Sequence, residues 1–219
     1  MNAKIFSSHL RVFQLVVVAM LMGGCATAYY NTLEKFGIEK RDILVSRIDD
    51  AQEAQGDAKE QFSSALERYR SVINVDGGDI EEIYDALNGD FERSTSRAEE
   101  VRERINEVEE VAEDLFEEWQ EEIALYSDAN LRRQSQVLYR ETQRDYEELS
   151  RAMRRAEAKM EPVLTLFQDQ VLFLRHNLNA RAIGALEAEL GSIEKATQSL
   201  IEEMERSIAE ANEFVASMS

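Results

Sequence analysis

Apolar residues recur at alternating steps of three and four along most of the chain. They form four successive runs, over residues 44–72, 91–126, 139–174 and 183–218. Such steps place side chains on one stripe of a helix, with the heptad period of coiled coils. The pattern therefore predicts an all-α fold, a long antiparallel helical bundle or coiled coil of three to four long helices.

The interruptions between the runs predict where the helices end. A glycine pair at 77–78 reverses the chain, and the "NGD" of 88–90 is expected to end a short helix, with its aspartate capping the next one. Ser127 and Asp128 are suited to cap a third helix that starts near Leu131. Around residues 176–180 the asparagines either end this helix or only kink it. Short turns join antiparallel neighbours, so we expect an antiparallel bundle.

Charge favours particular neighbours within that bundle. The segment 99–123 is strongly acidic, whereas the segment 131–159 is rich in arginine. Exposed ion pairs contribute only about 0 to 1 kcal/mol each, but they select pairing and register. We therefore expect these two helices to lie side by side.

The stretch "EPVLTLFQDQVLFLRHNLNARAIGAL", residues 161–186, is unusually apolar. Between its first glutamate and Arg175 it carries one charge. It is too short for a transmembrane span of roughly 20 apolar residues. A helix that is apolar all round is buried on more than one side, which indicates core. The alternative is a partner site, formed by whatever part of Leu164, Leu172 and Phe173 the fourth helix leaves uncovered.

The first thirty residues have the layout of an export signal. Positive charges precede an apolar run over 12–22, and the run ends in "MGGC", which resembles the bacterial lipobox. We expect residues 1–24 to be removed, Cys25 to be lipidated, 25–29 to form a short tether and 30–219 to form the helical domain. Ala26, after the cysteine, favours the periplasmic face of the outer membrane. Two or three acyl chains on the cysteine would hold the protein stably in the bilayer.

Composition excludes several classes of function. The chain has 44 acidic and 25 basic residues, a formal charge of −19, which argues against binding nucleic acid. Cys25 is the only cysteine, and His176 is the only histidine outside the expected signal. His176 is expected to be a capping or surface residue. We therefore expect no metal, no cofactor, no catalytic residue and no enzymatic activity.

Several segments together resemble a known family. They are "GCATAYYNTLEKFGIEKRDILVSRIDDAQEAQGDAKEQF", "NVDGGDIEEIYDALN", "LFEEWQEEIALYSDANLRRQS" and "MRRAEAKMEPVLTLFQDQVLFLRHNLNARAI". The chain is similar to a family of uncharacterised Gram-negative lipoproteins, catalogued as a domain of unknown function. The resemblance implies an all-helical exported lipoprotein and brings no activity or ligand with it.

These observations lead to two hypotheses about function. The first is a non-enzymatic, outer-membrane-anchored periplasmic lipoprotein with a structural or scaffold role, which contacts an envelope protein or associates with itself. The alternative is a bundle that carries a lipid or a small hydrophobic ligand in an internal cavity lined by Met153, Met160 and Phe167.

Overall fold

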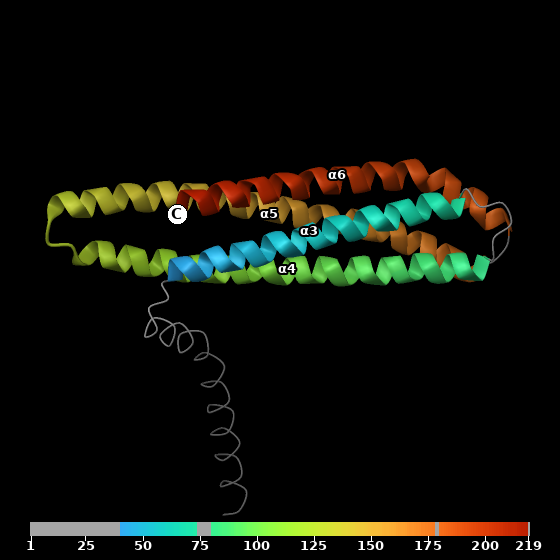
Figure 1. The fold of residues 1–219 in the computed structure, drawn as a ribbon, viewed down its shortest axis with the longest axis horizontal. Helices are drawn as coiled ribbons and strands as arrows, with labels where there is room; N and C mark the ends of the chain where they lie inside the picture. Colours follow the sequence, from blue (N-terminus) through green and yellow to red (C-terminus); the bar gives the residue numbers. More distant parts are fainter. Residues whose placement is uncertain (1–39, 74–79, 178–179, 219) are drawn as a thin grey trace, which may run out of the picture. The chain divides into compact units, whose positions relative to one another are not determined.

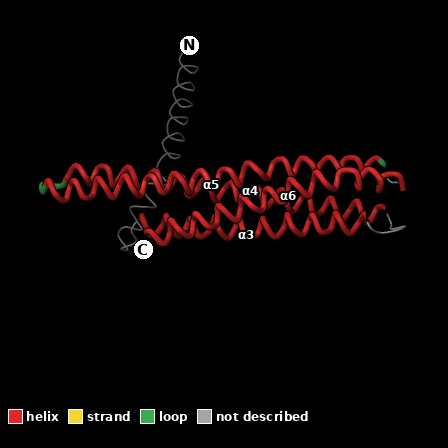
Figure 2. The backbone as a smooth tube through the Cα atoms, turned by 90° about the horizontal axis from the view of Figure 1, so that it is seen from above, coloured by secondary structure: helices red, strands yellow, loops and turns green. Residues whose placement is uncertain are grey.

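Four long helices make up nearly all of the described structure. The computed structural model describes residues 40–73, 80–177 and 180–218. Its helices are α3 (Lys40–Ile73), α4 (Ile80–Leu125), α5 (Ala129–His176) and α6 (Ala180–Met218), and these described segments contain no strand (Figures 1 and 2). The predicted all-α class and the number of long helices are confirmed. The arrangement of the helices is given below for residues from Leu44 onward, which form one unit.

Consecutive helices run in opposite directions. Gln61 of α3 donates a hydrogen bond to Ser94 of α4 at 3.4 Å, and Arg47 lies 3.6 Å from Glu107. The partner's number rises as the number along α3 falls, so the two helices are antiparallel. The same holds for α4 with α5 and for α5 with α6, as the prediction from short turns required.

The first and last helices close the bundle against each other. The Tyr69 hydroxyl of α3 donates to the Leu186 carbonyl oxygen of α6 at 2.8 Å, and Lys59 lies 3.4 Å from Glu205. Tyr69 also reaches Phe167 of α5 across the core, with ring centroids 6.4 Å apart. The result is an up-down-up-down bundle with one continuous core.

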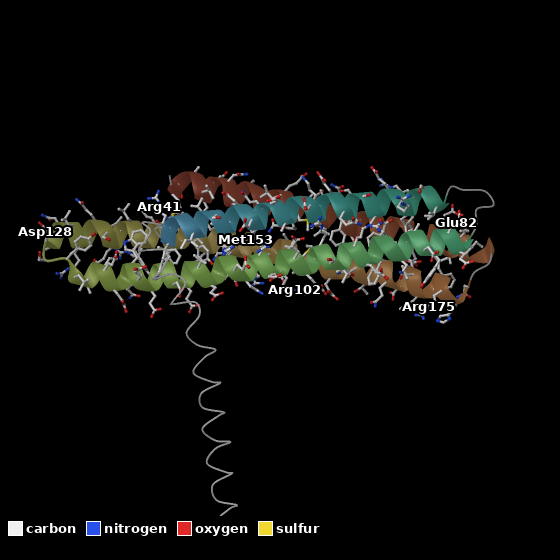
Figure 3. All side chains as sticks on the ribbon, turned by 60° about the horizontal axis from the view of Figure 1, so that its bottom comes forward. Arg41, Glu82, Arg102, Asp128, Met153 and Arg175 are labelled. Carbon is white, nitrogen blue, oxygen red and sulfur yellow. The ribbon has the colours of Figure 1, made fainter. Side chains whose placement is uncertain are left out.

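The largest side chains of the core occupy predicted heptad positions in all four helices. The largest fully buried side chains are Leu44, Ile48, Phe62, Tyr69, Ile105, Leu149, Met153, Met160, Leu174, Leu186, Ile193 and Leu200. Met153 lies between the helices, whereas Arg102 lies on their outside (Figure 3). Within the apolar stretch after Pro162, the side chains of Val163, Leu164, Phe167, Val171 and Leu174 are buried, so its interpretation as core is confirmed there.

The predicted helix break at residues 88–90 is wrong. α4 continues from Ile80 through this segment to Leu125, and Asp90 is buried inside the helix instead of capping it. Its carboxylate pairs with Arg93 one turn later and lies 3.6 Å from Arg68 of α3. Buried residues continue through the segment at steps of four and three, at Ile83, Leu87, Asp90 and Ser94. Packing along this stripe overrides the low helix propensity of the Asn-Gly pair.

The other predicted boundaries of α5 fall close to where they were expected. Asp128 caps its N-terminus by accepting hydrogen bonds from the backbone N–H of Asn130 and Leu131, at 2.7 and 3.1 Å. The helix passes through Pro162 and ends at His176. Asn177 is the C-cap, so the helix ends here and is not merely kinked.

Several expectations concern residues outside the described part of the chain. They are the signal, the lipidated Cys25, the tether and the glycine pair at 77–78. Among the described residues, no helix has the length and apolar character needed to cross a membrane.

Candidate functional site

The α4–α5 hairpin extends beyond the helices that cover it elsewhere (Figure 1). α4 and α5 have 46 and 48 residues, whereas α6 has 39. α6 still contacts α5 where Phe214 meets Tyr146, with ring centroids 6.1 Å apart, but its last described helical residue is Met218. We call residues 113–147, which surround the capped turn at Asp128 (Figure 3), the hairpin end.

The hairpin end exposes much of its apolar surface. Within it only Phe116 and Ile123 are buried. It contains five of the seven large hydrophobic side chains that are exposed in the described structure: Leu125 (82%), Tyr126 (39%), Leu131 (51%), Val137 (46%) and Leu138 (55%). Exposed apolar residues scattered singly are ordinary, but a gathering of them marks an interaction surface.

Two of these residues continue the core stripe of α5. Leu131 precedes the buried Leu149 by 18 residues, which is five helical turns, so both side chains leave the helix in the same direction. Leu138 precedes Leu149 by 11 residues, which is about three turns. On α4, Trp119 follows the buried Ala112 by one heptad and is half-exposed. We call Trp119, Leu131 and Leu138 the open stripe, because it is a stripe of core positions that stays exposed.

A groove lies between α4 and α5 in the same region. Its volume is about 400 Å³, and it is lined by Glu109, Glu113, Phe116, Glu117, Gln120, Tyr139, Gln143, Tyr146 and Glu147. Phe116 contacts both tyrosine rings: its centroid lies 5.8 Å from that of Tyr139 and 5.4 Å from that of Tyr146. We call it the hairpin groove. Its aromatic rings and four carboxylates combine apolar surface with negative charge.

At the end of this groove that lies farther from the turn, an ion-pair network links α4 and α5. Arg154 donates to both carboxylate oxygens of Glu109, and Ser150 donates to the same group at 3.1 Å. The hydrogen bond from Arg154 lowers the pKa of Glu109, and that carboxylate raises the pKa of Arg154. Burial raises the pKa of Tyr146, so its phenol stays neutral. Together with the 2.9 Å hydrogen bond of Arg102 to Glu157, this network confirms that the acidic and the arginine-rich helices lie side by side, as predicted.

The surface predicted from the sequence is only partly exposed. Leu164 is buried, with 8% of its surface accessible, so it cannot contact a partner. It occupies a core position because it lies next to the heptad residues Val163 and Phe167. Leu172 and Phe173 are 47% and 38% exposed, near the C-terminus of α5, and their role as a contact surface stays a prediction.

Sequence reasoning missed the hairpin end, although a signal for it was present. The first apolar run covers 29 residues, 44–72, whereas the second covers 36 residues, 91–126, and reaches the turn at 127–128. In an antiparallel bundle, residues of the second helix beyond the reach of the first lack that neighbour. The shorter first run was therefore a partial signal of the overhang.

Comparison with known proteins assigns the chain a family but no activity. Residues 29–218 match the model of a family described as "Protein of unknown function (DUF2959)". No curated protein matches the chain. In the part of the chain that the structure describes, no group of three or more His, Cys, Asp or Glu side chains is arranged to hold a metal ion.

Proposed function

The chain belongs to DUF2959, a family of proteins of unknown function, and we propose that it is a non-enzymatic lipoprotein that docks another protein of the cell envelope. Cys25 carries the lipid and holds the protein at the periplasmic face of the outer membrane. The rest of the described bundle outside the hairpin end, which we call the four-helix part, is a rigid support, and the hairpin end is the docking surface.

The observation that carries this proposal is the open stripe. Leu131 and Leu138 are 51% and 55% exposed, although their side chains leave α5 in about the same direction as the side chain of the buried Leu149. Covering apolar surface is favourable by roughly 25 cal/mol per Å², so a stripe of core positions left open favours association with another surface. A helix of a partner that lies in line with α6 would cover this stripe and continue the bundle.

A lipid anchor fits a docking role. A lipid at Cys25 would fix the protein to the bilayer, because two or more acyl chains bind far more stably than one. The hairpin end would then be the docking surface of a protein that stays at the membrane.

The test is photo-crosslinking in living cells from a photoreactive residue at position 138, with the lipid anchor intact. Thr165 is the matched control, because it is also exposed on α5 but lies on the four-helix part. We expect a discrete adduct with another protein from position 138 and none from position 165. Adducts only within the chain from position 138 would contradict the proposal, because its own residues would then cover the stripe.

The same experiment from position 172 tests the surface predicted from the sequence. An adduct with another protein from Leu172, with none from Leu138, would move the docking surface to the other end of α5.

The anchor is tested separately with Cys25→Ser. This variant should lose incorporation of a labelled fatty acid and become soluble in the periplasm, and retained label would contradict lipidation at this residue.

A further inference from the structure

An acidic row on α4 and two arginines on α5 border the hairpin groove, whose α5 wall also carries Glu147, paired with Arg151 of the same helix at 3.7 Å. Glu113 and Glu117 are exposed, lie one turn apart on α4 and form one wall of the groove. On α5, Tyr139 and Gln143 line the groove, and Arg140 and Arg144 follow them directly in the sequence. Successive residues point about 100° apart on a helix, so the two arginines lie on the outer rim beside the groove.

These arginines bond within their own helix. The Arg140 Nε donates to the Gln136 carbonyl oxygen at 3.0 Å, and Arg144 pairs with the adjacent Asp145 at 2.9 Å. Within the described residues, neither pairs with a carboxylate of α4. In the four-helix part, by contrast, Arg154 crosses to Glu109 of α4. Arg140 and Arg144 can therefore also contact carboxylates outside the molecule.

The two rows lie at similar heights along the hairpin. Phe116 of α4 faces Tyr139 of α5. Because the two helices are antiparallel, Glu117 lies one residue nearer the turn and Arg140 one residue farther from it, so their heights differ by about 3 Å, which their long side chains can span. Glu113 and Arg144 each lie four residues farther from the turn and have the same offset. A two-fold axis parallel to the helices exchanges the α4 and α5 sides but keeps each height. Around such an axis every glutamate of one copy meets an arginine of the other.

We propose that the hairpin groove and its charged rims form a self-association surface, which joins two copies of this chain side by side in the same direction. Glu117 faces the partner's Arg140, and Glu113 faces the partner's Arg144. The pairing covers the half-exposed rings of Tyr139 and Tyr146 in both copies. A two-fold axis perpendicular to the helices would instead bring α4 against α4, with acidic rows facing each other, so charge selects the parallel arrangement.

This surface is distinct from the open stripe. Leu138, Tyr139 and Arg140 are consecutive, so their side chains point to three different sides of α5, and Tyr139 faces α4. Leu138 follows the stripe of buried Leu149, while Arg140 lies on the groove rim. A dimer through the groove therefore leaves Leu131 and Leu138 accessible, so it does not require the open stripe; only its export and lipidation rest on the proposed function.

The first test is disulfide trapping in the periplasm of cells that produce two differently tagged full-length copies. One copy carries Glu117→Cys and the other Arg140→Cys; Cys25 remains in both as the lipidation site. We expect a disulfide-linked pair only when both variants are present. Disulfide-linked pairs of Glu117→Cys with itself would indicate the perpendicular arrangement and overturn the proposal, and so would the absence of any linked pair.

The second test separates charge recognition from a change in folding. The full-length lipidated protein is purified in detergent and its mass measured by light scattering over a range of concentrations. Arg140→Glu with Arg144→Glu should raise the dimer dissociation constant about tenfold or more. Adding Glu113→Arg and Glu117→Arg to the same chain reverses both rows and should restore the dimer. A monomeric wild type, or a failure of the reversed chain to recover, would overturn the proposal.

These experiments distinguish a failure of the dimer proposal from a failure of the docking proposal. Photo-crosslinking from position 138 should persist in the Arg140→Glu, Arg144→Glu variant, because the open stripe does not take part in the dimer. A basic segment of another protein could compete for the acidic wall of the groove. In that case Glu113→Arg with Glu117→Arg would abolish binding of an added Arg-rich peptide while the protein stayed monomeric, and the second copy would be rejected as the occupant.

Discussion

Replacing Gln55 by leucine should stabilise the protein. Gln55 occupies a core position of α3 and is 1% exposed. Neither its side-chain nitrogen nor its side-chain oxygen has a hydrogen-bond partner among the described residues. A buried polar group without a partner costs about 1 to 3 kcal/mol. Leucine has a similar size and no polar atoms, so Gln55→Leu should raise the free energy of unfolding by about 1 to 3 kcal/mol.

Thermal and urea unfolding, followed by circular dichroism, measure this effect. At this chain length 1 kcal/mol corresponds to roughly 2 to 4 °C, so the melting temperature should rise by about 2 to 12 °C. Gln52 supplies the matched control, because it lies one turn earlier on α3 and its amide donates to the Ile208 carbonyl oxygen at 3.1 Å. Gln52→Leu removes a made bond and should lower stability by about 0.5 to 1.5 kcal/mol.

The comparison of the two variants decides the reasoning. If Gln55→Leu melts no higher than the wild type while Gln52→Leu behaves as expected, the Gln55 amide is satisfied in solution and its burial carries no penalty. If both variants gain stability, apolar burial outweighs the hydrogen bond on this helix and the unpaired amide is not the cause.

Three further substitutions test other parts of the fold. Gly191→Ala on α6 should add about 0.5 to 1 kcal/mol in calorimetry, because an added Cβ there would have no atom within 4 Å and glycine is a poor helix former; an unchanged or lower melting temperature would contradict this. Burial raises the pKa of Tyr69, so the unfolded state ionises first and stability falls above about pH 10. Tyr69→Phe should cost about 1 kcal/mol at pH 7, through the lost bond to Leu186, and should reduce that alkaline loss; an unaltered pH profile would refute the assignment. The lowered pKa of Glu109 means that its carboxylate stabilises the fold above about pH 4.3 and that this contribution is lost as the pH falls below that value. Glu109→Gln should therefore be less stable at pH 7, by up to about 1 kcal/mol at this partly exposed site, and should lose less on acidification in urea titrations at pH 7, 5 and 3.

Heptad spacing predicted the core because a long helix has one way to bury a stripe with that period. The same argument placed Val163 and Phe167 in the core. It failed at Asp90, where a local capping signal suggested a break but the stripe continued through it. Cap residues bias the end of a helix by only about 1 kcal/mol, which packing over several turns exceeds.

The hairpin end shows a different limit of the sequence. Its heptad positions, such as Trp119 and Tyr139, read as core like any other, and only the three-dimensional overlap of the helices shows that they are half-exposed. Charge gave a partial signal, since the acidic and Arg-rich segments were recognised as neighbours. The similar height of Glu117 and Arg140, however, depends on the register of α4 against α5, which the facing rings of Phe116 and Tyr139 establish.

The thin packing of the hairpin end also affects how the backbone opens. With only Phe116 and Ile123 buried between residues 113 and 147, few tertiary contacts oppose local unfolding there. We expect the amides on both sides of Asp128 to exchange with deuterium much faster than those near Met153, which is buried in the four-helix part. Whatever covers the hairpin end, whether an envelope protein or a second copy, should slow this exchange. Deuterium exchange of the hairpin amides therefore reports whether another molecule covers the hairpin end, without a label on the protein.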